Sequence, residues 1–216
     1  MAESKATYSR ITFVRHGQSI GNLEDRMQGL ADFPLSETGR KQAKALARHW
    51  QENGNRFDVS ITSPLSRAEE TARILVQGLN IPSLEFEPLW VERDMGLRSG
   101  MTMSNIREKF IKPEFVNPYV AEDNSMESDW ALYLRAGQAL HKVLQRSPGS
   151  YLVVSHGAIL HMTLYVILGI VPQPNSQGPY FKMDNTCVSS FRYYPDLHQW
   201  RADAICDQAH LNSKNY

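Results

Sequence analysis

The chain has 216 residues, of which 42% are hydrophobic, and its 23 basic and 23 acidic side chains cancel to a formal net charge of zero. This balance gives no broad electrostatic attraction to nucleic acid or to an anionic membrane, so neither is expected as a partner. Two cysteines exclude a disulfide scaffold, and the first residues lack the apolar stretch of a secretory signal, so a cytoplasmic location is expected.

In the first half of the chain, strand-like runs alternate with amphipathic stretches. The apolar run 11–14 predicts a buried strand, and the stretch after Ser36, its N-cap, has apolar residues at helical spacing. A second strand is expected over 57–62. Ser63 and Pro64 then supply an N-cap and a proline at the first position of a second helix.

The middle of the chain is less regular. The run 84–90 predicts a third strand, and a short helix is expected near 102–110. A long helix is predicted over 128–145. Its candidate core positions are Ala131, Leu134, Ala139, Leu140, Val143 and Leu144.

The last third repeats the pattern and ends in a hairpin. A fourth buried strand is predicted over 151–154, followed by an apolar helix over 158–169 that is too short to span a bilayer. Segments 186–194 and 198–205 predict a closing hairpin. With a two-residue loop, its cysteines would face one another, so a bridge is geometrically conceivable although a reducing compartment does not favour it.

Strands that alternate with helices are typical of the α/β class. We therefore predict a three-layer α/β/α sandwich with a mostly parallel central sheet covered by helices on both faces. No linker, repeat or low-complexity segment interrupts the sequence, so residues 1–216 are expected to form a single domain with an ordered core over about 8–207.

Four short polar motifs come just after apolar runs, beside glycines or predicted helix starts. They are Arg15-His16-Gly17-Gln18-Ser19 with Asn22, Ser63-Pro64-Leu65-Ser66-Arg67, Glu92 with Gly96, and Ser155-His156-Gly157. In open α/β sheets, ligands bind beyond the carboxyl ends of the strands, so these distant motifs are expected to converge on one crevice.

The residue types suit a bound phosphoryl group. Arg15 and Arg67 can donate bidentate, charge-assisted hydrogen bonds, each of which contributes on the order of 1.5 to 3 kcal/mol. Helix starts add backbone N–H groups, and Gly17 and Gly157 are expected to let the backbone approach the ligand closely.

The same motifs contain the groups for phosphoryl transfer. A neutral histidine can attack phosphorus through a ring nitrogen, so one of His16 and His156 is expected to be neutral. The second of the two is expected to be a protonated donor to the phosphoryl oxygens. Glu92 is the carboxylate predicted to protonate the leaving group, with Asp94 as the alternative.

The chain resembles the histidine phosphatase superfamily, in the branch of cofactor-dependent phosphoglycerate mutases and related small phosphatases. The residues that carry the resemblance are Arg15-His16-Gly17-Gln18-Ser19-x-x-Asn22, Asp32-x-Pro34-Leu35-Ser36-x-x-Gly39-x-x-Gln42-Ala43, Ser63-Pro64-Leu65-x-Arg67-Ala68-x-x-Thr71-Ala72, Glu92-x-x-x-Gly96-x-x-x-Gly100 and Ser155-His156-Gly157. The resemblance covers about residues 10–205.

The resemblance implies a phosphoglycerate mutase-like fold and a transient phosphohistidine on His16. Glu92 would be the proton donor and then the base for the attacking water, and Ser63 would help to orient His16. The residues that would hold the phosphoryl oxygens are Arg15, Asn22, Arg67 and His156. No metal and no cofactor are implied by that chemistry.

The motifs depart from the family pattern at three places. Gln18 stands where the family often has Glu, and Ser99 stands where it often has Glu or Gln. Met126-Glu127-Ser128 matches only part of a Gly-Glu-Ser motif. The segment 113–129 has no Arg or Lys to hold a substrate carboxylate, which favours hydrolysis of a small phosphorylated substrate. A mutase and a non-catalytic phospho-ligand module are the alternatives.

No catalytic part is expected of the remaining histidines. These are His49, His141, His161, His198 and His210. The pattern leaves open whether the protein is a monomer or a homodimer.

Overall fold

The computed structural model describes residues 7–111, 113–123 and 125–212. Within them, one six-stranded sheet has the order β3-β2-β4-β1-β5-β6. Its strands are β1 Ser9–Arg15, β2 Val59–Thr62, β3 Leu84–Phe86, β4 Ser150–Ser155, β5 Val188–Tyr194 and β6 Gln199–Asp207. Strands β3, β2, β4 and β1 pair in parallel, and β5 and β6 add an antiparallel edge.

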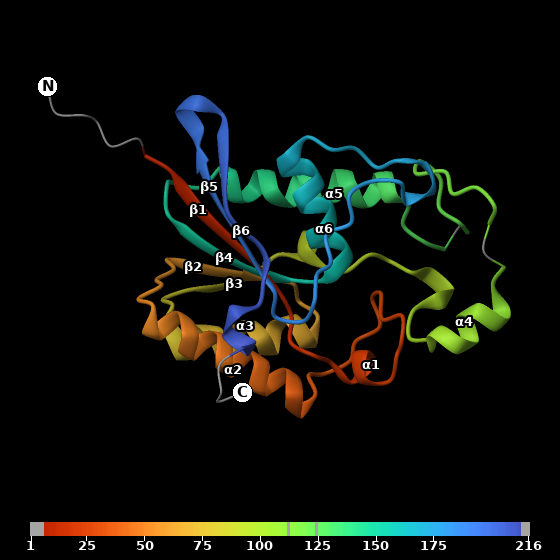
Figure 1. The fold of residues 1–216 in the computed structure, drawn as a ribbon, viewed down its shortest axis with the longest axis horizontal. Coiled ribbons are helices and arrows are strands. Elements are labelled where there is room, and N and C mark those ends of the chain that lie inside the picture. The colour runs from red at the N-terminus through yellow and green to blue at the C-terminus, as the bar shows by residue number, and fades with distance from the viewer. Residues whose placement is uncertain (1–6, 112, 124, 213–216) are drawn as a thin grey trace, which may run out of the picture.

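Helices cover both faces of this sheet. The helices of the described chain are α1 Ile20–Leu23, α2 Glu37–Glu52, α3 Ser66–Leu79, α4 Met103–Lys109, α5 Asp129–Leu144 and α6 Gly157–Leu168, with 3₁₀ turns at Pro88–Trp90, Gly96–Arg98, Pro174–Ser176, Pro195–Leu197 and Ala209–Leu211. In Figure 1, α2 and α3 lie below the sheet and α5 and α6 lie above it. This arrangement confirms the predicted α/β class, the mostly parallel sheet and its two helical layers.

The alternation of side chains along the strands builds two separate cores. On β1, Phe13 packs into the core shared with α5 and α6, whereas Val14 packs into the core shared with α2 and α3. Strand β4 divides in the same way, with Val153 on the first side and Val154 on the second. Because both strands are buried on both faces, their carboxyl ends are held rigidly.

Two predicted elements differ at their ends. Strand β3 stops at Phe86, because Pro88 has no N–H for the sheet and a 3₁₀ turn begins there, with the Glu87 side chain accepting from Leu89 N at 3.1 Å. Helix α3 begins at Ser66 with Leu65 as N-cap, so the prediction that Ser63 caps it is wrong. By contrast, Ser36 caps α2 as predicted.

Helix α5 has the predicted extent, and the predicted core positions Ala139, Leu140 and Val143 are buried. Ala131 and Leu134, predicted to be core positions, are exposed, and the Leu134 side chain is 58% accessible. The face that packs on the sheet and α6 is Leu132, Ala136, Ala139, Leu140 and Val143. Leu132 and Ala136 take the place of Ala131 and Leu134, because they continue the stripe of Ala139, Leu140 and Val143 at helical spacing.

The two cysteines of the closing hairpin are free thiols. The loop is a 3₁₀ turn between Tyr194 and Gln199, so the condition under which the cysteines would face one another, a two-residue loop, is not met, and the register shifts further along the strands. Both sulfurs instead lie 3.7 Å from the sulfur of Met183.

Among the residues that the structure describes, we find no helix with the length and apolar character needed to cross a membrane.

Candidate active site

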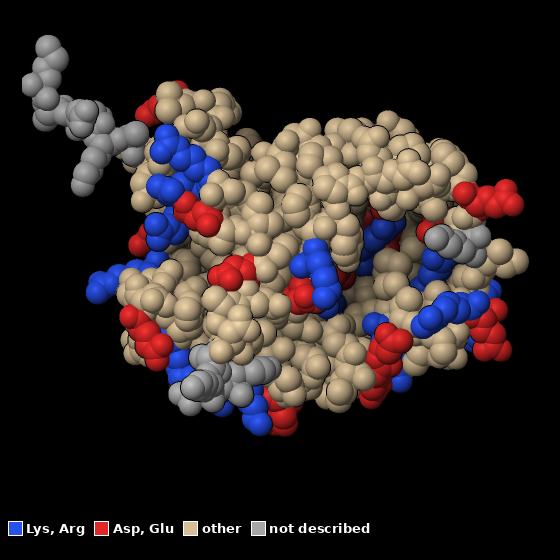
Figure 2. Space-filling model, in the orientation of Figure 1, with Lys and Arg blue, Asp and Glu red and all other residues tan. Residues whose placement is uncertain are grey.

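The predicted site residues meet beyond the carboxyl ends of β1 and β4. A cavity of about 160 Å³ is lined by Arg15, His16, Asn22, Arg67 and Glu92, among other residues. Figure 2 shows a hollow on this face between the α6 layer and α1 and α4, with basic side chains visible inside it and both signs of charge mixed around it. The convergence predicted from the four motifs is therefore present.

His16 is buried and its tautomer is set by the backbone. Its Nδ1 lies 2.7 Å from the carbonyl oxygen of Gly17. Because a carbonyl only accepts, Nδ1 carries the proton and Nε2 keeps its lone pair. Burial, and then the charges of Arg15 and Arg67, hold the pKa of His16 well below its ordinary value. The ring is therefore a neutral base at physiological pH.

His156 lies against His16, with 5.1 Å between the ring centroids. Its Nε2 is 2.8 Å from the hydroxyl of Ser63, and Leu65 N donates to the same hydroxyl oxygen at 3.3 Å. Burial, and then the charge of Arg67, lower the pKa of His156 well below its ordinary value. The unliganded ring is thus neutral, contrary to the predicted protonated donor, and Ser63 orients His156 rather than His16.

Four arginines line the cavity, namely Arg15, Arg26, Arg67 and Arg93. After burial, the charges of Arg15 and Arg67 are the ones that lower the pKa of His16. The Arg67 side chain is 1% accessible and donates from Nη1 to Ala31 O at 3.0 Å and from Nη2 to Gly29 O at 2.9 Å. Burial lowers the pKa of Arg67 to about 10, so the group stays charged near neutral pH. Arg15 donates from Nη1 to the carbonyl of Met183.

Three buried nitrogens in this cluster have no hydrogen-bond partner within the described part of the chain. They are Nε of Arg15, Nε of Arg67 and Nδ1 of His156. An unsatisfied buried donor costs about 1 to 3 kcal/mol, and more when it is charged. Both arginine Nε atoms are donors, and Nδ1 of His156 is a third donor in the tautomer in which the Ser63 hydroxyl donates to Nε2. In that tautomer an anion can satisfy all three atoms.

The buried imidazoles predict a protein that loses stability in acid. His16 and His156 bind protons less readily in the folded chain, so the unfolded chain takes up protons first as the pH falls below about 6.5. The stabilisation is complete above that pH and declines toward the lowered folded-state pKa values, by up to about 1.4 kcal/mol per pH unit for each ring.

Urea unfolding at a series of pH values measures this slope. His156→Gln is expected to flatten it, whereas His141→Ala, on the exposed face of α5, is the matched control that keeps it. A free energy of unfolding that is constant below about pH 6.5 would contradict the neutral, buried state of the rings.

The side chain of Asn22 is held through its oxygen, so its donor atom, Nδ2, points elsewhere than to the partners of that oxygen. Its Oδ1 accepts from Ser19 N and Ser19 Oγ, both at 3.1 Å, and from Asn185 Nδ2 at 3.2 Å. Asn185 also donates to the carbonyl of His16 at 3.0 Å. Asn185 was not predicted from the sequence, because it lies in an irregular segment with no recognisable motif.

The carboxylate of Glu92 contacts the first backbone amides of α6. Its Oε1 accepts from Arg93 N at 2.8 Å, Ala158 N at 3.1 Å and Ile159 N at 3.3 Å, and its Oε2 also accepts from Ala158 N at 3.3 Å. The first free amides of α6 therefore bind the Glu92 carboxylate, in place of the phosphate that helix starts were predicted to bind. A Cβ on Gly157 would lie 3.8 Å from Glu92 Oε2 and 3.7 Å from Arg15 Nε, so both groups border one space.

A long-range clamp holds the Glu92 segment. Arg135 on α5 donates to both carboxylate oxygens of Glu127, at 2.8 and 2.7 Å, and to the carbonyls of Leu89, Val91 and Glu92. Glu127, from the partial Gly-Glu-Ser motif, thus positions Arg135, which in turn holds the backbone at Glu92. Asp94, the alternative acid, accepts from Gly96 N at 2.8 Å within a turn and is not among the cavity's lining residues.

The two motif glycines have different surroundings. A Cβ on Gly17 would lie 2.5 Å from the carbonyl oxygen of Gly39, so Gly17 allows the loop after β1 to touch α2. This contact replaces the predicted approach of Gly17 to the ligand. Gly157 does border the cavity, next to Arg15 and Glu92.

Within the described residues, no group of three or more His, Cys, Asp or Glu side chains is arranged to hold a metal ion.

Comparison with known proteins is consistent with this geometry. Residues 11–207 match the model of the histidine phosphatase superfamily, branch 1. The chain is 31% identical to the uncharacterized phosphatase PhoE of Bacillus subtilis (strain 168), over 94% of this chain and 96% of that protein. It is 29% identical to a protein of Cronobacter sakazakii named "Probable phosphoglycerate mutase GpmB", over 94% and 95% of the two chains.

A solved structure, Bacillus stearothermophilus YhfR, has the same fold. It superposes with a TM-score of 0.81 at 26% identity, over 94% of this chain and 100% of that chain.

Proposed function

Because the chain belongs to the histidine phosphatase superfamily, branch 1, we propose that it hydrolyses small phosphomonoesters through a phosphohistidine on His16. In this proposal Glu92 is the general acid and base. Arg15, Asn22, Arg67 and His156 bind the phosphoryl oxygens.

One observation carries the proposal: three unsatisfied donors surround a neutral imidazole. Arg15 Nε, Arg67 Nε and His156 Nδ1 are buried without partners in the described chain, and His16 packs against His156. A phosphoryl group would accept from all three, and charge-assisted bonds of this kind contribute about 1.5 to 3 kcal/mol each. The donors would also neutralise the charge that develops on the oxygens in the transition state.

In the first step, the lone pair on Nε2 of His16 attacks phosphorus and the bond from phosphorus to the ester oxygen breaks. Glu92, in its protonated form, gives its proton to the departing alkoxide. Oε1 accepts three backbone N–H groups and, among the described residues, Oε2 accepts only from Ala158 N, at 3.3 Å, so the transferable proton would sit on Oε2, which borders the same space at Gly157 as Arg15 Nε.

In the second step, water attacks the phosphohistidine. The Glu92 carboxylate takes the water proton, the bond between phosphorus and Nε2 breaks, and inorganic phosphate leaves. The Gly17 carbonyl keeps the proton on Nδ1 throughout, so His16 returns to the tautomer that starts the next cycle.

Metal removal tests this chemistry. Since Arg and His side chains would carry the phosphoryl charge, hydrolysis of p-nitrophenyl phosphate is expected to proceed at an unchanged rate in excess EDTA. Vanadate, a phosphate analogue that accepts a fifth ligand, is expected to inhibit it. Loss of activity in EDTA with recovery on adding Mg²⁺ would contradict the proposal.

A mutase is the second candidate, favoured by the similarity to the Cronobacter protein. It would return the phosphoryl group to a second hydroxyl of the substrate in place of water. Assays of phosphoglycerate isomerisation, with and without a bisphosphate primer, distinguish the two. Isomerisation faster than phosphate release would make the mutase the better description.

A further inference from the structure

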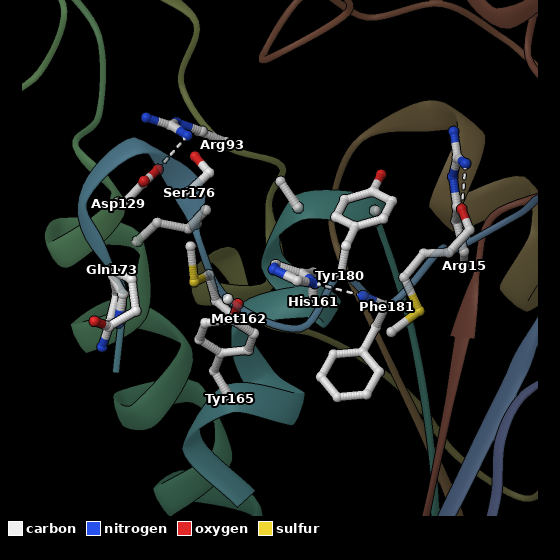
Figure 3. A pocket seen from close by; sticks show the side chains of 16 residues that line it. Arg15, Arg93, Asp129, His161, Met162, Tyr165, Gln173, Ser176, Tyr180 and Phe181 are labelled. Atoms are coloured by element: carbon white, nitrogen blue, oxygen red, sulfur yellow. Dashed lines mark hydrogen bonds and ion pairs between the residues drawn. The ribbon is translucent and has the colours of Figure 1, made fainter. Parts of the chain in front are cut away.

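A second and larger cavity adjoins the phosphoryl site. Its volume is about 360 Å³, and Arg15, Arg93 and Ala158 line both cavities. In Figure 3, Arg15 lies on one side of this cavity and Arg93, Asp129 and Gln173 lie on the other. A group attached to the phosphorus would therefore extend from Arg15 into this space, which we call the leaving-group cavity.

Aromatic rings form much of the wall between these two sides (Figure 3). The ring of His161 lies 4.6 Å from Tyr165, 5.4 Å from Tyr180 and 5.9 Å from Phe181, between centroids. Nδ1 of His161 accepts from Phe181 N at 3.4 Å, and burial lowers the pKa of His161, so the ring is neutral. This wall offers planar surfaces without formal charge.

The charged side chains away from Arg15 neutralise one another. Nη1 of Arg93 lies 2.6 Å from Oδ1 of Asp129, and their side chains are 21% and 10% accessible. Nε of Arg93 also donates to the carbonyl of Glu127 at 2.9 Å. A carboxylate on the substrate would meet a cation already paired and a like charge beside it, which is unfavourable in a partly buried space.

On the basis of the proposed phosphatase function, we infer that the preferred substrate is the phosphate ester of an uncharged, ring-bearing alcohol. The ring packs against His161, Tyr165, Tyr180 and Phe181. Asp129 is a specificity determinant that disfavours esters bearing a carboxylate, because it neutralises Arg93.

Three esters of primary alcohols test the inference on the unmodified protein, since they break the same kind of bond. The values of kcat/KM are expected to be highest for 2-phenylethyl phosphate, lower by about tenfold or more for glycerol 3-phosphate, and lowest for 3-phosphoglycerate. The inference is overturned if 3-phosphoglycerate is the best of the three. If none of the three, and no other phosphomonoester, is hydrolysed, the proposed function itself fails.

Two variants separate charge from ring packing. Asp129→Asn is expected to raise kcat/KM for 3-phosphoglycerate relative to glycerol 3-phosphate by about tenfold, because it frees Arg93 and removes the like charge. Asp203→Asn, in the exposed ion pair with Arg192, is the matched control with an unchanged ratio. An unchanged ratio in Asp129→Asn would overturn the role of Asp129.

The ring packing is tested at the rim of the cavity, where Tyr180 is 79% exposed and its removal spares the core. Tyr180→Ala is expected to lower kcat/KM for 2-phenylethyl phosphate relative to glycerol 3-phosphate by about threefold or more. Equal effects on both esters would overturn the aromatic contact. Should Asp129→Asn fold poorly, the order of the three esters in the unmodified protein still decides the inference.

Discussion

His16→Ala is expected to lower kcat for phosphomonoester hydrolysis by about 10⁴-fold or more, because it removes the atom that would form the covalent bond to phosphorus. The hydrogen bond from Nδ1 to Gly17 O leaves Nε2 as the attacking atom. Of the described histidines, His16 is the one that lines the cavity, and the charges of Arg15 and Arg67 act on it there. Steady-state kinetics with p-nitrophenyl phosphate measure the loss.

Two measurements distinguish a lost nucleophile from a lost fold. His16→Ala should still bind inorganic phosphate, because Arg15 Nε, Arg67 Nε and His156 Nδ1 remain. His141→Ala, on the exposed face of α5, is the matched control and should retain full activity. Wild-type turnover in His16→Ala would show that another residue attacks phosphorus.

Glu92→Gln is expected to slow the first turnover of alkyl phosphates by about 10² to 10⁴-fold, while p-nitrophenol release in the first turnover changes little. A nitrophenolate leaves without help, whereas an alkoxide needs a proton. The variant keeps its geometry, because the amide oxygen of Gln can replace Oε1 as the acceptor of the three backbone N–H groups.

Rapid mixing provides the measurement. The variant should release p-nitrophenol in a burst equal to the enzyme concentration and then slow down, since the water that attacks phosphohistidine has lost its base. Asp94→Asn is the comparison, because that carboxylate accepts from Gly96 N in a turn. Equal losses of both esters in the first turnover would exclude Glu92 as the acid.

The parts of the fold and site that were predictable depend on local patterns. Apolar runs ending in Arg15-His16 and Ser155-His156 marked β1 and β4, and the parallel sheet then brought these ends together. The position of Glu92 was predicted although the strand before it is shorter than expected. It is held by contacts such as Arg135 to Val91 O, which join residues 44 positions apart.

The parts that were not predictable depend on contacts that leave no local trace. Ser63 precedes a helix, so it has the pattern of an N-cap, but its hydroxyl contacts His156, 93 residues away. Asn185 supports His16 and Asn22 from a segment without regular structure. On α5, Leu134 and Leu132 each fit a helical stripe, and only packing against α6 decides between them.

The central position of β1 has a consequence for biosynthesis. This first strand is flanked by β4 and β5, and the loop after it is closed by Thr186 N, which donates to Arg15 O at 3.0 Å and His16 O at 3.3 Å. Arg15 also depends on Met183, 168 positions later. On the proposed mechanism, a nascent chain on the ribosome would carry the attacking imidazole for most of translation without a finished anion pocket, and would gain catalytic competence only as these last segments dock.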